Sequence, residues 1–443
     1  MSPPETPSLT YEDTLRSRDR LRVAAARTRG RRGRLLVLFA GPGVLVMLGE
    51  NDGPSMLSYA ASGATYGIGF FLPFILVTFA AAVFVQNMGV RVGAVTHRGF
   101  SQLIFQRFGP LWGWMSTGDL LFTNVITLIS ELVAIRVGLA YFGIAPWVAV
   151  AATVALVTVS SLAGSYQRWE TIALSLAFFN LLFLAAAYFS HPAPGAVARA
   201  FATWSPFPHG TLVAFLLLVA SDIGATVTPW MLFFHQSATT DKGLTVRDLG
   251  GGRFDTAAGG ILAAVTGCGA LLVAVPLFVH HIRVRSEGGA GYATALEPLI
   301  GSTGATLFAF GLIEAGALAV LTISASTGYA LAETLPGRSH SFNAAPRSAR
   351  AFHLSNIGVT IAAGLVILIP GAPLLAIALN ANLLATVLMP AGLVFLLLLA
   401  NDRDLMGTAR NSRLANAVGV AITAVIVAAG GGYAVVSLIQ ALR

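Results

Sequence analysis

The chain has 443 residues, of which 56% are hydrophobic and 10% are charged. Soluble globular domains carry about 25% charged residues, so this composition excludes an ordinary soluble protein and predicts an all-α polytopic membrane protein. The single cysteine, Cys268, excludes a disulfide framework and argues against a cysteine-based metal or redox site.

The net charge of +8 is concentrated near the N-terminus, where nine of the 27 Lys and Arg residues precede residue 35. A secretory signal would follow its basic region with a short apolar core and a cleavage site, whereas Gly41 and Pro42 open a long apolar span. We therefore interpret residues 1–34 as a basic cytoplasmic tail that contacts anionic lipid, not as a nucleic-acid-binding arm.

Eleven apolar runs follow the tail, which predicts about eleven transmembrane helices with no separate soluble domain. They fall at about 36–66 (interrupted between 49 and 56), 68–90, 111–140, 145–163, 171–190, 210–234, 256–279, 304–332, 354–370, 373–399 and 415–441. Residues 35–443 are thus the predicted transporter domain.

The loops indicate the orientation. With a cytoplasmic N-terminus, only five Lys or Arg residues lie outside the tail and the cytoplasmic loops: Arg136, Arg199, Arg283, Arg285 and Arg443. The positive-inside rule therefore predicts an integral protein of the cell (inner) membrane with a cytoplasmic N-terminus. If the chain contains two five-span repeats, at 35–192 and 209–400, the odd number of spans in each makes them inverted, and 412–441 is an extra helix.

Two of the spans are interrupted at matching places. Gly49–Ser55 breaks span 1, and Gly224–Trp230 breaks span 6, five spans later. Pro54 and Pro229 each remove a backbone donor, which leaves carbonyl groups near both breaks without helical partners. Secondary transporters bind their substrate where a broken helix in each half lies near the bilayer midplane. A carboxylate beside free carbonyls predicts a cation site there.

Asp52 is the first candidate ligand, because an ionised carboxylate at this depth costs several kcal/mol unless a cation or donor compensates it. Its alternative role is to cap the broken helix. Ser55 could supply a hydroxyl to the ion, or cap the second half of span 1. From span 6, Ala225 could contribute its carbonyl and Thr228 its hydroxyl.

Four further residues are predicted to border the cavity: Glu50, Asn51, Trp230 and Asn380. Glu50 is either a second cation-attracting carboxylate or the partner of an arginine. The Trp230 ring either narrows the cavity or packs between helices. Asn380 serves either an ion path or hydrogen bonds within the bundle.

Other intramembrane polar residues could form a proton or ion path: Asp119, Glu131, Asp222 and His235. Asp119 and Glu131 share a helix face with Thr123 and Thr127, at steps of four residues. This stripe lines either an aqueous path or a helix interface. Glu131 could instead pair with Arg136, and His235 could be an interfacial histidine at the end of span 6.

Enzyme motifs are missing from the sequence. Gly250–Gly252 lacks the Lys-Ser/Thr of a P-loop, and no metalloprotease helix or nucleophile elbow occurs. The sequence therefore predicts no enzyme activity, no cofactor and no ATP-driven transport.

The chain resembles the NRAMP family of divalent-metal transporters from Gly41 to the last span. Six motifs carry the resemblance: Gly41-Pro42-Gly43; Asp52-Gly53-Pro54-Ser55 with Gly63-Ala64 and Tyr66-Gly67; Gln86, Arg91, Gly93 and Thr96 with Glu131; Gly224-Ala225-Thr226-Val227-Thr228-Pro229-Trp230; Arg253-Phe254-Asp255-Thr256; and Asn401-Asp402-Arg403-Asp404-Leu405-Met406-Gly407. The resemblance implies a LeuT-like fold with an inverted 5+5 repeat and broken helices 1 and 6.

The resemblance also implies the ligands and shows where this chain departs from them. The family's Asp, Asn, backbone carbonyl and Met thioether correspond to Asp52, Ser55, Ala225 and Thr228, so the thioether is missing. The family's span-6 His is Trp230, and its proton-carrying span-3 Asp falls at Leu128. This pattern is similar to the NRAMP-related magnesium transporter branch.

These observations predict a secondary transporter that imports a divalent cation by alternating access, with Mg²⁺ preferred and Mn²⁺ next. A proton-coupled Mn²⁺/Fe²⁺ transporter of the ordinary NRAMP type is the first alternative. An organic-solute symporter, such as an amino-acid symporter, on the same fold is the second, although Asp52 would repel a substrate carboxylate. A metal sensor without transport is a third.

Overall fold

The structure is a computed structural model that describes residues 41–205, 211–282, 284, 291–335, 341–372 and 374–441. Every regular element in these residues is a helix. The predicted basic tail, 1–34, lies outside the described residues. The all-α prediction is confirmed.

The first half of the chain contains α3 (Pro42–Gly49), α4 (Gly53–Tyr66), α5 (Phe71–Thr96), α6 (Phe100–Phe108), α7 (Pro110–Tyr141), α8 (Pro146–Ser161), α9 (Tyr166–Ala177), η1 (Phe178–Leu181) and α10 (Leu182–Phe189). The second half contains α11 (Pro194–Thr203), α12 (Leu212–Gly224), α13 (Pro229–Asp241), η2 (Val246–Asp248), α14 (Leu249–Val279), α15 (Gly291–Glu333), α16 (Arg350–Ile367), α17 (Leu374–Asn401), α18 (Arg403–Met406), η3 (Gly407–Ala409) and α19 (Arg413–Ala441).

The described residues contain nine helical segments long and apolar enough to cross a membrane, and α8 is a shorter apolar helix. The broken pair α3 and α4 takes the place of the first predicted span. Together these segments occupy the positions of the eleven predicted spans. The order of these segments along the chain matches the order of the predicted spans.

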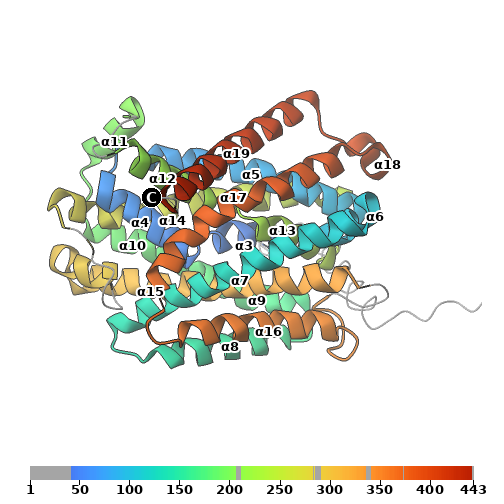
Figure 1. The fold of residues 1–443 in the computed structure, drawn as a ribbon, viewed down its shortest axis with the longest axis horizontal. Coiled ribbons are helices and arrows are strands. Elements are labelled where there is room, and N and C mark those ends of the chain that lie inside the picture. Colours follow the sequence, from blue (N-terminus) through green and yellow to red (C-terminus); the bar gives the residue numbers. More distant parts are fainter. Residues whose placement is uncertain are drawn as a thin grey trace, which may run out of the picture.

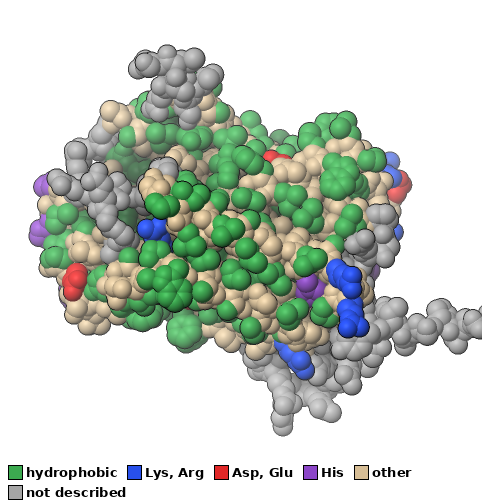
Figure 2. Space-filling model, turned by 60° about the horizontal axis from the view of Figure 1, so that its bottom comes forward, with side chains coloured by type: hydrophobic (Ala, Val, Ile, Leu, Met, Phe, Trp, Pro, Cys, Tyr) green, Lys and Arg blue, Asp and Glu red, His purple; other side chains and the backbone are tan. Residues whose placement is uncertain are grey.

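The long helices run side by side, and their connections lie at two ends of the bundle (Figure 1). Helices α6 and α18 lie at one end, which we call the α6 end, and α11 lies at the other, which we call the α11 end. Apolar side chains cover much of the face shown in Figure 2. A bilayer would contact such a surface between the two ends.

Both predicted helix breaks are present. Helix α3 ends at Gly49 and α4 begins at Gly53, after Asp52 caps it by accepting a 2.8 Å hydrogen bond from the Ser55 N–H. Helix α12 ends at Gly224 and α13 begins at Pro229. Pro54 and Pro229 lie at the first turns of α4 and α13. Proline suits these positions because its missing N–H would have no intrahelical acceptor there.

The broken helices lie inside the bundle. Helix α14 packs against α3, α4 and α5, while α15 packs against α7 and α16. Burial decreases outward: 72% of the apolar window of α15 is buried, against 17% for α19. The breaks are therefore enclosed by protein, and α19 is a peripheral helix.

Candidate metal site

Three carboxyl groups gather at the break in the first span. Glu50 and Asp52 come from the break itself and Glu131 from α7, and all three side chains are 0% exposed. Glu131 Oε2 accepts a 2.9 Å hydrogen bond from the Gly53 N–H, which joins α7 to the start of α4. The three groups interact electrostatically with one another, so the break carries an acidic centre.

Two hydrogen bonds join this break to the break in span 6. The Thr228 hydroxyl donates to Glu50 Oε2 at 2.8 Å, and the Tyr59 hydroxyl donates to the Ala225 carbonyl at 2.9 Å. Asp52, Ala225 and Thr228 are all buried. The structure thus brings the two predicted halves of the site together.

Several oxygen atoms at the breaks are buried and have no hydrogen-bond partner in the protein. They are Glu50 Oε1, Asn51 Oδ1, Asp52 Oδ2, Ser55 Oγ and Glu131 Oε1. Burying polar atoms without partners costs free energy, so such atoms are normally satisfied. Four of the five are acceptors only, which suits a cation or its water ligands and not an anionic guest.

The groups at the breaks that could bind a cation are oxygen atoms of several kinds. Among the residues that the structure describes, no group of three or more His, Cys, Asp or Glu side chains has the spacing of a metal site. Oxygen ligands from carboxylate, hydroxyl and carbonyl groups, completed by water, suit hard cations.

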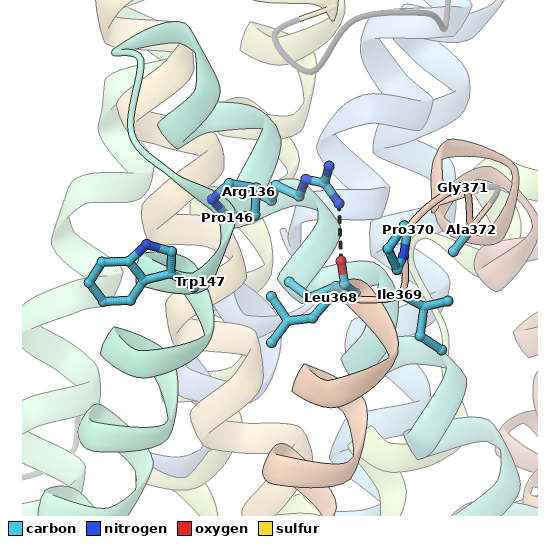
Figure 3. A pocket seen from close by; sticks show the side chains of 9 residues that line it. Arg136, Pro146, Trp147, Leu368, Ile369, Pro370, Gly371 and Ala372 are labelled. Carbon is cyan, nitrogen blue, oxygen red and sulfur yellow. Dashed lines mark hydrogen bonds between the residues drawn. The ribbon is translucent and has the colours of Figure 1, made fainter.

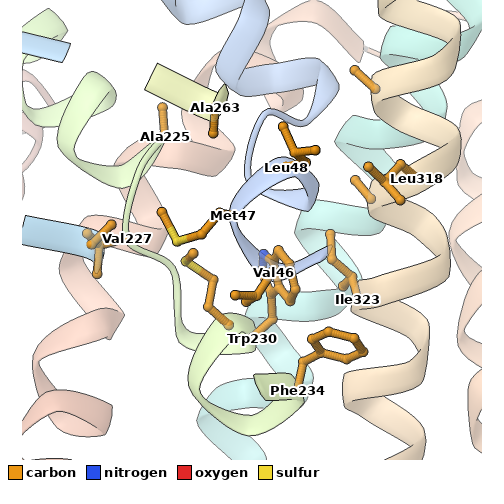
Figure 4. Packing of buried hydrophobic residues seen from close by; sticks show 14 of the residues in the cluster. Val46, Met47, Leu48, Ala225, Val227, Trp230, Phe234, Ala263, Leu318 and Ile323 are labelled. Atoms are coloured by element: carbon orange, nitrogen blue, oxygen red, sulfur yellow. The ribbon is translucent and has the colours of Figure 1, made fainter. Parts of the chain in front are cut away.

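Apolar side chains surround the breaks, including Val46, Leu48, Phe234 and Ile323 (Figure 4). Trp230 is fully buried, and a Cβ at Gly49 would lie 3.1 Å from its Cη2 atom. The ring therefore packs against the end of α3 and walls the site. A hydrophobic surround of this kind excludes bulk water and strengthens electrostatic attraction inside it.

The predicted cavity residues differ in their placement. Asn51 points its amide toward α14, where it donates to the Ala263 carbonyl at 2.9 Å and to Thr266 Oγ1 at 2.5 Å. Asn380 lies away from the breaks: it is exposed, and its Oδ1 accepts a 3.4 Å bond from the Tyr433 hydroxyl. The neighbouring Asn382 is the buried residue that packs near α12, because a Cβ at Gly224 would meet its carbonyl oxygen at 1.9 Å.

The residues predicted to form a proton or ion path lie in different parts of the bundle. Asp222 lies between α12 and α4, and accepts hydrogen bonds from Ser58 at 2.7 Å and Ser62 at 2.9 Å. His235 does not end span 6, since α13 continues to Asp241; it is buried, and its Nδ1 lies 2.9 Å from Gln86 Oε1. Asp119 is half-buried on α7, where its backbone carbonyl accepts a 2.8 Å hydrogen bond from the Thr123 hydroxyl.

Glu131 and Arg136 do not form the ion pair that the sequence left open. Arg136 donates instead to the Ile367 carbonyl at 3.1 Å, beside a cavity of about 310 Å³ (Figure 3). Pro146, Trp147 and residues 367–372 complete the lining of this cavity, which includes no carboxylate. It is therefore not a second cation site.

Sequence reasoning missed Tyr59 and Asp255. Tyr59 follows Asp52 by seven residues, two helical turns, so its place on the same face of α4 was available from the spacing. Asp255 belongs to a quoted motif, but its contacts are long-range: its carboxylate accepts from the Gly41 N–H at 3.0 Å and the Gly43 N–H at 2.8 Å. It ties the start of α3 to α14.

The α6 end is closed by further polar contacts. Lys242 of α13 pairs with Glu170 of α9 at 2.9 Å, and both are buried. Tyr329 of α15 donates to Asp241 at 2.8 Å. The side chains of Glu50, Asp52 and Ser55 at the breaks are themselves fully buried.

Comparison with known proteins agrees with this arrangement. A divalent metal cation transporter, MntH 1, of Pseudomonas aeruginosa is 26% identical over 310 residues, which are 65% of this chain and 68% of that protein. The crystal structure of a manganese transporter from Eremococcus coleocola has a TM-score of 0.73 at 18% identity, covering 90% of this chain and 87% of that one. A Na⁺-coupled sialic acid symporter shares the fold more distantly, with a TM-score of 0.52 at 12% identity and 88% of each chain covered.

The family model described as natural resistance-associated macrophage protein-like matches residues 43–436, which include both breaks and all three carboxyl groups. The chain therefore belongs to the NRAMP family.

Proposed function

We propose that the protein is a secondary transporter that imports a divalent metal cation by alternating access, with Mg²⁺ the preferred substrate and Mn²⁺ the next. The observation that carries this proposal is the set of buried, unpaired oxygen atoms of Glu50, Asp52, Ser55 and Glu131 at the meeting point of two broken helices. The Pseudomonas aeruginosa and Eremococcus coleocola proteins described above are metal transporters by name, which supports a metal substrate.

The preference for Mg²⁺ rests on the chemistry of the donors. Asp52, Ser55, Thr228 and the Ala225 carbonyl offer only oxygen, which suits Mg²⁺, Ca²⁺ and Mn²⁺ better than soft metals. Mg²⁺ sheds its waters reluctantly, so it is usually held by one or two carboxylates and several waters. One or two carboxylates of the acidic centre, completed by water molecules, fit a partly hydrated Mg²⁺.

Two buried methionines bear on this preference for a hard cation. Met231 follows Trp230 in α13, and Met47 of α3 lies among the side chains around the breaks (Figure 4). The end of the Met47 side chain points toward α14, because its Cε would lie 3.3 Å from a Cβ at Gly260. Neither thioether occupies the position of Thr228, which binds Glu50 instead.

The polar contacts at the α6 end support the proposal of alternating access. The contacts of Asp255 with Gly41 and Gly43 hold α3, and the Lys242–Glu170 pair holds α13, across the α6 end. We propose that their release opens the site toward this end. Because the described cationic residues gather there, we place the α6 end in the cytoplasm of an inner-membrane protein with a cytoplasmic N-terminus.

Two other transport functions remain alternatives. A proton-coupled Mn²⁺/Fe²⁺ transporter would use the same site with a titrating partner. An organic-solute symporter would share the fold, as the sialic acid symporter does. Three buried carboxyl groups disfavour an anionic solute, because like charges repel strongly in a site of low dielectric constant.

Replacement of Asp52 tests the site. We expect Asp52→Ala to abolish divalent-cation influx into proteoliposomes, because it removes the carboxylate that we propose as the charged ligand of the ion. A cation indicator trapped in the lumen gives the initial rate, and size-exclusion chromatography confirms folding. Ser55→Ala serves as the matched control and should reduce the rate only modestly, because a retained water can replace the hydroxyl. Wild-type influx in a well-folded Asp52→Ala protein would refute the assignment.

A further inference from the structure

Two arginines lie together at the α6 end, away from the metal site. Arg91 is on α5 and Arg253 on α14. The two helices are in close contact here, since a Cβ at Gly252 would lie 3.1 Å from Val90 Cγ1. The positive charges of Arg253 and Arg91 interact electrostatically. Arg91 lies five residues before the end of α5 and Arg253 four after the start of α14, so both sit near the edge of the apolar bundle.

Among the residues that the structure describes, no carboxylate forms an ion pair with either arginine. The adjacent Asp255 turns its carboxylate to Gly41 and Gly43. Arg91 donates one bond to Asn411 Oδ1, in the loop before α19, while its Nε is buried without a partner. Two like charges at a half-buried position repel each other, and a buried guanidinium N–H without an acceptor is costly.

The surface next to the pair is apolar and faces outward. Phe254, Ile261 and Val265 of α14 are 59%, 68% and 42% exposed. Their spacing of seven and four residues places them along one face of the helix. This stripe begins beside Arg253 and runs toward the middle of the bundle, so a cationic group stands at the end of a lipid-facing strip.

We propose that Arg91 and Arg253 bind the phosphate of an anionic phospholipid of the bilayer, with an acyl chain along Phe254, Ile261 and Val265. The phosphate would accept hydrogen bonds from the exposed Arg253 guanidinium, and its charge would offset the repulsion between Arg253 and Arg91. Arginine suits this role because its planar fork matches phosphate oxygens. The inference depends on the membrane position of the chain and not on the identity of the transported ion.

Thermal stability of the purified full-length protein tests the proposal. The melting temperature is measured in detergent with added phosphatidylglycerol, with phosphatidylcholine, or with soluble glycerol 3-phosphate at the same concentration. We compare the wild type with Arg253→Gln and with the control Arg199→Gln, an exposed arginine on α11 at the opposite end. Arg253→Lys retains the charge and is the conservative variant.

We expect phosphatidylglycerol to raise the melting temperature of the wild type and of Arg199→Gln above that in phosphatidylcholine. Arg253→Gln should lose this difference, and Arg253→Lys should keep part of it. In phosphatidylcholine alone, Arg253→Gln should melt at or above the wild-type temperature, because the repulsion with Arg91 is gone. Equal shifts from the two lipids, an undiminished shift in Arg253→Gln, or the same shift from glycerol 3-phosphate would each overturn the proposal.

Discussion

Thr228 carries the clearest chemical difference between this site and that of ordinary NRAMP transporters. The resemblance places a Met thioether at its position, whereas here a hydroxyl donates a 2.8 Å hydrogen bond to Glu50. The hydroxyl keeps a lone pair for an ion or its water. The hydroxyl also orients the Glu50 carboxylate. The sequence alone does not predict this contact between the two breaks.

Thr228→Met should move selectivity toward soft metals. The thioether adds a ligand that favours Cd²⁺ over Mg²⁺, and the substitution also frees Glu50 from its hydrogen bond. We expect Cd²⁺ to inhibit Mg²⁺ influx at a concentration about 10-fold or more below that needed for the wild type, which corresponds to roughly 1.4 kcal/mol. Thr228→Ser keeps the hydroxyl and should retain wild-type selectivity. An unchanged Cd²⁺ sensitivity in Thr228→Met would mean that residue 228 does not face the ion.

The sequence identified the residues at the breaks because glycine, proline and charge are unusual inside apolar spans. Asp52, Ser55, Ala225 and Thr228 are accordingly brought together. The apolar sequence around Asn380 does not indicate which face of α17 points inward, and the structure exposes Asn380 and buries Asn382. The hydrogen bonds of Tyr59 and Asp255 depend on tertiary contacts, which residue type alone does not reveal.

At the scale of elements, the long helices were predictable and the short ones were not. Apolar runs of about 20 residues follow from the thickness of the bilayer. Helices α6 and α11 have only nine and ten residues, so they lack that signal and were not predicted. The kink in α15, where Gly301 has a φ of 76°, likewise lies before the apolar run 304–332 and outside its pattern.

The close contact between α4 and α7 at the site requires glycine at position 53. A Cβ there would lie 2.1 Å from Ala134 Cβ and 3.3 Å from Glu131 Oε2. We expect Gly53→Ala to separate the two helices, to lower stability by about 1–3 kcal/mol and to abolish cation influx. Thermal unfolding and flux are measured on the same preparation.

Gly118→Ala is the matched control, because a Cβ at Gly118 of α7 meets no atom within 4 Å. This variant should transport like the wild type and be at least as stable, since alanine is the better helix former. Equal behaviour of the two variants would contradict the tight α4–α7 contact on which the geometry of the acidic centre depends.

For the whole molecule, the driving force is the main difference expected from ordinary NRAMP transporters. The resemblance places a His and an Asp that carry protons at Trp230 and Leu128, and both of these residues are apolar and fully buried. Glu131 remains, but its Oε2 accepts a bond from Gly53. We therefore expect metal influx to be driven by the membrane potential, with little accompanying acidification.

A pH indicator inside the liposomes checks this prediction. Influx of Mg²⁺ or Mn²⁺ at an imposed negative-inside potential should leave the internal pH nearly constant, as it does in liposomes without protein. Proton entry in a fixed ratio to metal entry, lost in Glu131→Gln while the metal still binds, would support the proton-coupled alternative instead.

The most direct test of a hard-cation transporter is a competition in proteoliposomes. Influx of Mg²⁺ is recorded with an indicator in the lumen at a fixed gradient, while Mn²⁺ or Cd²⁺ is added outside. An oxygen-only site predicts that the wild type carries Mg²⁺, that Mn²⁺ competes with it, and that Cd²⁺ competes poorly. Ready transport of Cd²⁺ with exclusion of Mg²⁺ would place a sulfur ligand such as Met231 or Met47 at the ion and would contradict the magnesium assignment.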